Sequence, residues 1–134
     1  MQRILVVDDS RETRKLLRAV LETDGYEVAV AGTVDEAVVL LPRFDPHLMV
    51  IDVRLPDGDG FGVAAQLRNH RVWRTLPIVA ISAYGEGSAE MEARAAGCAR
   101  FLRKPIEPRD LLSAVRGAIA GMRAARPLEQ ERRV

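Results

Sequence analysis

The sequence predicts an α/β fold: a single domain with a doubly wound sheet of five parallel strands and helices on both faces. Three observations support this fold class. Short apolar runs alternate five times with stretches in which apolar residues recur at helical spacing. Three of the five runs are continuously apolar, as strands buried on both faces are. The length of 134 residues suits one domain, and 48% hydrophobic residues suffice for a core.

Five strands are expected, in chain order: Ile4–Val7, Val28–Val30, Leu48–Ile51, Ile78–Ile81 and Phe101–Leu102. Each is followed by a helix whose apolar positions share one face, as at positions i, i+3, i+4 and i+7 of the second helix. These positions are Leu16, Leu17, Val20 and Leu21, then Val34, Ala37, Val38 and Leu41, then Phe61, Ala64 and Leu67, then Ala89 to Ala96, and last Leu111, Leu112, Val115 and Ile119.

Local signals support these boundaries. Thr33 and Glu36 have the spacing of a capping box, and Asp9 with Glu12 resembles an acidic variant of one. Turn-forming residues mark two helix ends and a loop after the third strand: Gly25, Gly97, Pro56, Gly58 and Gly60.

Strands two and five are less apolar than the others and are therefore expected at the edges of the sheet. Glu27 interrupts the second strand, and Arg100 and Arg103 flank the fifth. The flavodoxin-like doubly wound order 2-1-3-4-5, with right-handed crossovers, places both at the edges.

The composition excludes several classes of protein. A formal net charge of +1 favours neither a nucleic-acid binder nor an acidic tail. Cys98 is the single cysteine, which excludes an internal disulfide and fits a reducing compartment. The first apolar run is too short for a signal peptide, and no run reaches the ~20 residues of a membrane helix. We expect a cytoplasmic protein with its domain at residues 1–122 and a charged tail at 123–134.

Polar residues follow four of the strands. Asp8 and Asp9 end the first, Asp52 the third, Ser82 the fourth and Lys104 the fifth. Carboxyl ends of parallel strands meet at one edge, where open α/β sheets bind ligands. Three close carboxylates repel one another, and oxygen-only ligands with room for water suit Mg²⁺. A metal, an amine and a hydroxyl stabilise a transferring phosphoryl group, which makes the central Asp52 a candidate nucleophile.

These motifs together resemble the receiver domain of two-component response regulators over residues 3 to 121. The spacing of the motifs also resembles that of the family: Ser82 follows Asp52 by 30 residues, and Lys104 follows Ser82 by 22 residues. The matching segments are Val6–Asp9, Ile51–Pro56, Asp59-Gly60, Ile81–Ala83 and Lys104-Pro105.

The resemblance implies a Mg²⁺ site and a phosphoacceptor. Asp52 would accept a phosphoryl group from a histidine kinase or a histidine phosphotransfer protein. Asp9 and Asp52 would bind Mg²⁺ directly, together with the backbone carbonyl of Arg54, and Asp8 would bind it through water. Lys104 would pair with the phosphoryl oxygens. The chain would be a signalling domain rather than an enzyme, limited to its own phosphorylation and dephosphorylation.

The resemblance also implies a switch. Ser82 would turn its hydroxyl toward the phosphoryl group, and Phe101 would then swing inward and alter the surface of the fourth helix, fifth strand and fifth helix. A cis Lys104-Pro105 bond would hold the lysine inward. A downstream protein target is expected, with a monomer or a phosphorylation-linked homodimer, because no DNA-binding or catalytic region follows.

The chain departs from the family pattern at some positions. Ser82 stands where threonine is common, and Phe101 replaces a frequent tyrosine, which removes a hydroxyl from the switch. Arg54 and Tyr84 lie beside the phosphoacceptor in sequence. We expect them to shield the phosphoryl group from water and to tune its lifetime.

Three other functions are considered. A phosphatase or phosphotransferase with an aspartyl nucleophile usually has a second acid two residues later, where this chain has Arg54. A nucleotide or flavin module needs a phosphate-binding loop after the first strand, where Asp8, Asp9 and Ser10 would repel phosphate. A receiver-like scaffold with an unused site is disfavoured by the intact acids and lysine.

Overall fold

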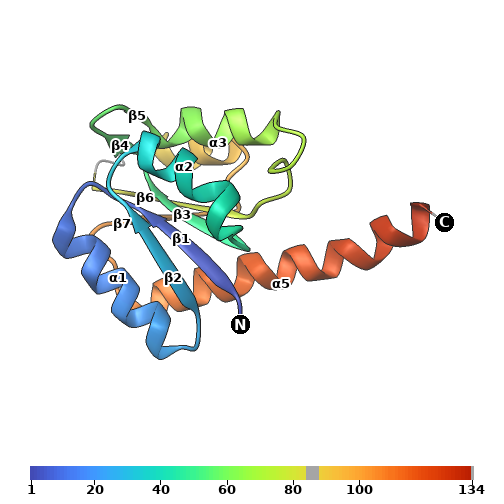
Figure 1. Cartoon of the computed structure of the whole chain (residues 1–134), viewed down its shortest axis with the longest axis horizontal. Coiled ribbons are helices and arrows are strands. Elements are labelled where there is room, and N and C mark those ends of the chain that lie inside the picture. Colours follow the sequence, from blue (N-terminus) through green and yellow to red (C-terminus); the bar gives the residue numbers. More distant parts are fainter. Residues whose placement is uncertain (84–87, 134) are drawn as a thin grey trace.

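The computed structural model describes residues 1–83 and 88–133, with side chains described as far as residue 121. Five parallel strands form one sheet in the order β2-β1-β3-β6-β7 (Figure 1). The strands are β1 (Arg3–Val7), β2 (Glu27–Ala31), β3 (Leu48–Asp52), β6 (Ile78–Ser82) and β7 (Arg100–Arg103). This order is the predicted one, and both strands expected at the edges lie there.

Helices cover both faces of the sheet (Figure 1). They are α1 (Arg11–Thr23), α2 (Val34–Phe44), α3 (Gly60–Arg68), α4 (Ala89–Ala95) and α5 (Pro108–Arg133). Helix α5 is longer than expected and continues beyond the sheet as far as Arg133. Among the described residues, no helix combines the length and apolar character needed to cross a bilayer.

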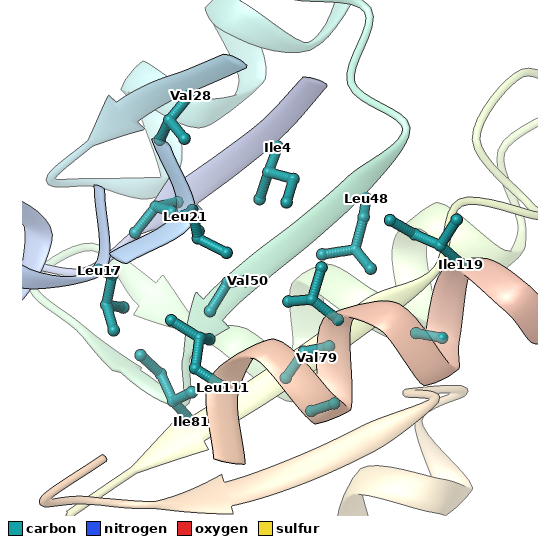
Figure 2. Packing of buried hydrophobic residues seen from close by; sticks show 14 residues of the cluster. Ile4, Leu17, Leu21, Val28, Leu48, Val50, Val79, Ile81, Leu111 and Ile119 are labelled. Carbon is teal, nitrogen blue, oxygen red and sulfur yellow. The ribbon is translucent and has the colours of Figure 1, made fainter. Parts of the chain in front are cut away.

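Two apolar clusters lie on opposite faces of the sheet because alternate strand residues point to opposite sides. On one face, Leu17 and Leu21 of α1 and Leu111 and Val115 of α5 pack against the sheet (Figure 2). The other cluster contains side chains of α2, α3 and α4. Central strands β3 and β6 are buried along their whole length, which explains their continuous apolar sequence.

The segment after β3 is more ordered than a simple loop. Arg54–Leu55 (β4) and Gly58–Asp59 (β5) pair as a short antiparallel hairpin. The amide of Gly60 donates to the carbonyl of Val53 at 2.8 Å and closes its base. A Cβ on Gly60 would lie 2.4 Å from the carbonyl oxygen of Asp52, so this close approach requires glycine.

The helix caps confirm one expectation and correct another. Thr33 Oγ1 accepts from the amide of Glu36 at 3.1 Å, and Glu36 Oε1 accepts from the amide of Gly32 at 3.1 Å. The proposed pair of Asp9 and Glu12 is wrong, because α1 begins one residue later. Its N-cap is Ser10, whose hydroxyl accepts from the amide of Thr13 at 3.2 Å.

Glycine ends two helices as expected. Gly25 and Gly97 have φ values of 91° and 90°, which side chains other than glycine rarely adopt.

Candidate functional site

The predicted site residues meet at the carboxyl edge of the sheet. Asp8 directly follows β1, Asp52 ends β3 and Ser82 ends β6. All three are buried, with exposed fractions of 0%, 5% and 1%. Asp9, the next residue after Asp8, is exposed. Buried polar groups are costly without partners, so these side chains need compensating charges or hydrogen bonds at this edge of the sheet.

Lys104 joins two of the acids. Its Nζ lies 2.8 Å from Asp8 Oδ2 and 2.9 Å from Asp52 Oδ2. Its backbone amide donates to the carbonyl of Ser82 at 2.9 Å, which holds the Lys104 backbone beside the end of β6. The Lys104-Pro105 peptide bond is cis, as expected. The hydrogen bond to Ser82 gives Lys104 a defined backbone position from which its side chain reaches both acids.

The charges at this edge shift two pKa values. Burial raises the pKa of Asp8, and the nearby Asp52 charge adds to this, although Lys104 and the amide of Ser10 act in the opposite direction. Burial alone would lower the pKa of Lys104, but its bonds to Asp8 and Asp52 outweigh burial and raise that pKa. The lysine therefore stays charged between the two acids.

The acids have the geometry of a cation site. One carboxylate oxygen from each of Asp8, Asp9 and Asp52 lies within 4.8 Å of the others. Asp8 Oδ1 accepts from the amide of Ser10 at 2.8 Å. Its fully buried Oδ2 lies 2.8 Å from Lys104 Nζ. Three carboxylates around a single amine leave a net negative charge, and an all-oxygen set of this kind fits a hard cation such as Mg²⁺.

The hairpin after β3 contacts Asp52 through its backbone. The amide of Arg54 donates to Asp52 Oδ1 at 3.0 Å, while the Arg54 side chain is exposed. The amide of Val53 donates to the carbonyl of Ile81 at 2.9 Å. Tyr84, the other residue expected to shield the site, lies outside the described residues.

Phe101 lies in β7 and is half-buried against the cluster formed with α2, α3 and α4. It pairs in register with Ala80, two residues before Ser82. The guanidinium carbon of Arg103 lies 6.0 Å from the centre of its ring. Phe101 is thus a sheet neighbour of the strand that ends in Ser82.

The sequence did not reveal two supporting residues. Arg14 Nη1 donates to the backbone carbonyl of Asp8 at 2.8 Å. Asp57, at the turn of the hairpin, accepts from two backbone amides of α2. No local sequence pattern predicts either contact, because each contact joins two elements that come together only when the chain folds.

The two histidines lie outside the site. His47 is half-buried, and its Nδ1 accepts from the amide of Arg3 at 2.9 Å. His70 is exposed, and its Nδ1 accepts from the amide of Val72. Both nitrogens have backbone partners far from the acids, so neither histidine belongs to the site.

The doubly wound sheet with acids and a lysine at its carboxyl edge defines a class of α/β domain, and comparison with known proteins identifies the family. The profile of the response regulator receiver domain matches residues 4–116. The chain belongs to this family of two-component signalling domains.

Relatives and solved structures agree with this assignment. The chain is 41% identical over 112 residues to an uncharacterized 14.6 kDa protein of Leptolyngbya boryana, covering 84% of this chain and 86% of that one. A putative response regulator from Chloroflexus aurantiacus superposes with a TM-score of 0.84 at 34% identity, covering 89% and 98% of the two chains. The beryllofluoride-activated NtrC4 receiver domain dimer superposes with a TM-score of 0.84 at 29% identity, covering 91% and 99%. The chain spans 47% to 62% of the transcriptional regulators that it matches.

Proposed function

We propose that the chain is a phosphorylation-driven switch whose phosphoacceptor is Asp52. The observation that carries this proposal is the contact of Lys104 with both Asp8 and Asp52 beside Asp9. A purely structural ion pair would need one acid, whereas three acids around one amine leave excess negative charge. A divalent cation would neutralise that excess charge, and the charged amine could donate a hydrogen bond to an incoming phosphoryl oxygen.

The proposed reaction transfers a phosphoryl group from a phosphohistidine. An Asp52 carboxylate oxygen attacks phosphorus, the bond between phosphorus and the histidine nitrogen breaks, and that nitrogen keeps the electron pair and is protonated. Asp52 carries the phosphoryl group as an acyl phosphate. Lys104, already 2.9 Å from Asp52, pairs with a phosphoryl oxygen and leaves Asp8. The Asp52 side chain is held in place by the amide of Arg54.

The residues that would hold Mg²⁺ are Asp9 and Asp52, with the carbonyl of Arg54, and Asp8 through water. When bound, the ion would neutralise charge that develops on the phosphoryl oxygens. Asp8 and Asp52 are nine-tenths or more buried, which limits contact with bulk solvent and strengthens these electrostatic interactions.

The proposed switch begins at Ser82. Its hydroxyl would hydrogen-bond to the phosphoryl group, and the movement would make room for Phe101 to turn inward from its half-buried position. Phosphoryl contacts available in only one conformation would shift the population toward it. The changed surface of α4, β7 and α5 would then bind a downstream protein or a second copy.

The proposed partners are a histidine kinase or a histidine phosphotransfer protein in the cytoplasm. We place the receiver domain at residues 1–122, which extends slightly past the family match, and the charged tail at 123–134. The NtrC4 relative is described as activated by beryllofluoride and dimeric, which supports testing this chain with the same phosphoryl stand-in.

One experiment tests the proposal. The protein is incubated with Mg²⁺ and acetyl phosphate or a phosphoramidate and then weighed by mass spectrometry. We expect a mass gain of one phosphoryl group that is lost in Asp52→Ala and when Mg²⁺ is chelated. Bound Mg²⁺ without any mass gain would instead indicate a receiver-like scaffold with an unused site.

A further inference from the structure

The turn of the β4–β5 hairpin is attached to a helix that is distant in sequence. Asp57 Oδ1 accepts from the amide of Val34 at 2.8 Å, and its Oδ2 accepts from the amide of Asp35 at 3.1 Å. These amides belong to the first turn of α2, where backbone donors lack partners within the helix. Asp57 therefore caps α2 from a segment 22 residues further along the chain.

Two further observations support a specific contact. A Cβ on Gly58 would lie 2.8 Å from Val34 Cγ2, so the turn touches α2 closely enough that a side chain there would have to displace Val34. Hydrogen bonds from the amides of Val34 and Asp35 lower the pKa of Asp57, which shows that the cap favours the charged carboxylate. A negative charge at a helix N-terminus is stabilised by the helix dipole as well.

The other end of the hairpin lies at the phosphoacceptor. The hairpin begins at Arg54, whose amide donates to Asp52 Oδ1. It ends at Asp59, and the amide of the next residue, Gly60, donates to the carbonyl of Val53. The hairpin thus has two attachments, one to the backbone beside Asp52 and one to α2.

We propose that Asp57 is a positioning residue for the Asp52 site: it anchors the hairpin to α2 and so fixes the backbone of Arg54 beside Asp52. This inference rests on the proposed function, in which the Arg54 carbonyl and Asp52 bind the cation. Without the anchor, the short hairpin keeps its two-residue strands, the Gly60–Val53 hydrogen bond at its base and the packing of Leu55 against the apolar cluster. An isolated hairpin of this size has only marginal stability. The Arg54 backbone would therefore sample more positions, and the affinity for the cation would fall.

A matched pair of variants separates positioning from helix capping. Asp57→Ala removes the cap on Val34 and Asp35, whereas Thr33→Ala removes the cap on Glu36 of the same helix and leaves the hairpin attached. Thermal unfolding, Mg²⁺ affinity by calorimetry and the amide NMR signal of Arg54 without metal are measured for each. Asp57→Asn, with one acceptor oxygen, is the conservative variant.

Both alanine variants are expected to unfold at a lower temperature, because each uncaps α2. Only Asp57→Ala is expected to weaken Mg²⁺ binding, by roughly tenfold, the lower end of the range for residues that support metal ligands. It alone should shift the Arg54 amide signal, and Asp57→Asn should show an intermediate effect in both measurements. If Asp57→Ala fails to fold, Asp57→Asn carries the same comparison.

The inference is overturned if Asp57→Ala loses stability yet binds Mg²⁺ as tightly as the wild type, or if Thr33→Ala weakens binding equally. Failure of the proposed function looks different: the wild-type chain itself then binds no Mg²⁺ and gains no phosphoryl mass, and the inference falls with it. If the wild type binds Mg²⁺ and Asp57→Ala binds it equally tightly, only the positioning role of Asp57 is overturned, and the proposed function stands.

Discussion

Asp9 is the exposed member of the acid group, and at the residue scale it offers the clearest test of the cation site. Lys104 bonds to Asp8 and Asp52 but no described contact joins it to Asp9. Asp9→Asn therefore removes negative charge from a crowded site without breaking the lysine contacts. Without metal, we expect this variant to be at least as stable as the wild type.

Added Mg²⁺ should raise the unfolding temperature of the wild type and have much less effect on Asp9→Asn. A ligand at a hundred times its Kd stabilises the folded state by about 2.7 kcal/mol. Differential scanning calorimetry with and without Mg²⁺ measures the effect. Glu27→Gln, at the opposite end of the sheet, is the control and should respond as the wild type does. An equal Mg²⁺ response in Asp9→Asn would contradict the assigned ligand.

Cys98 is the one cysteine, and its thiol is buried, with 8% exposed. Burial raises its pKa from 9.0 to about 11, despite the opposing charge of Arg68. Because the folded chain holds this proton more tightly than the unfolded chain, stability should fall as the pH rises from about 9 toward 11. At pH 8, the thiolate population is about a hundredfold below that of an ordinary thiol. Iodoacetamide should accordingly label the native protein far more slowly than the urea-unfolded protein, and equal labelling rates would show an accessible thiol.

At the scale of elements, two glycines of α3 have opposite roles. A Cβ on Gly60 would lie 2.4 Å from the Asp52 carbonyl oxygen, whereas the nearest heavy atom to a Cβ on Gly62 is 4.0 Å away. Gly60→Ala must shift the backbone of the β3–α3 connection and should cost about 1–3 kcal/mol. Gly62→Ala should stabilise α3 by about 0.5–1 kcal/mol.

Urea unfolding of both variants measures this difference. Gly60→Ala should also reduce the phosphoryl mass gain, because the shifted backbone adjoins Asp52, while Gly62→Ala should keep it. Similar stabilities for the two variants would mean that the close approach at Gly60 is relaxed at little cost.

On the scale of the whole molecule, the two apolar clusters share a single sheet. Leu111 of α5 lies in one cluster and Leu67 of α3 in the other, with 0% and 7% exposed. Leu111→Ala and Leu67→Ala should each destabilise the protein by about 2–5 kcal/mol. Because every central strand contributes to both clusters, each variant should lower the midpoint of the same single transition.

Circular dichroism and tryptophan fluorescence of Trp73 should therefore report coincident unfolding curves in both variants. Leu16→Ala, where the side chain is 49% exposed, is the control and should change stability by less than about 0.5 kcal/mol. Separate transitions for the two faces would contradict the shared core.

Much of the fold was predictable because its signals are local. The continuous apolar runs of β3 and β6 predicted central strands, and Glu27 and Arg100 correctly marked the edge strands. The site edge was predictable for the same reason, since parallel strands bring Asp8, Asp52 and Lys104 to one side. The start of α1 was misplaced by one residue because Asp9 and Ser10 are both good capping residues, and only backbone geometry selects Ser10.

Strand periodicity, strand order and the meeting of acids and lysine at one edge thus followed from the sequence alone, because they depend on which residues are apolar and on where strands end. Only the tertiary structure decided how Lys104 divides its charge between Asp8 and Asp52, and that Asp57 attaches the hairpin to α2. These contacts join segments far apart in the chain through distances of a few ångströms. No local pattern encodes such distances, which arise only when helices and loops pack against a completed sheet.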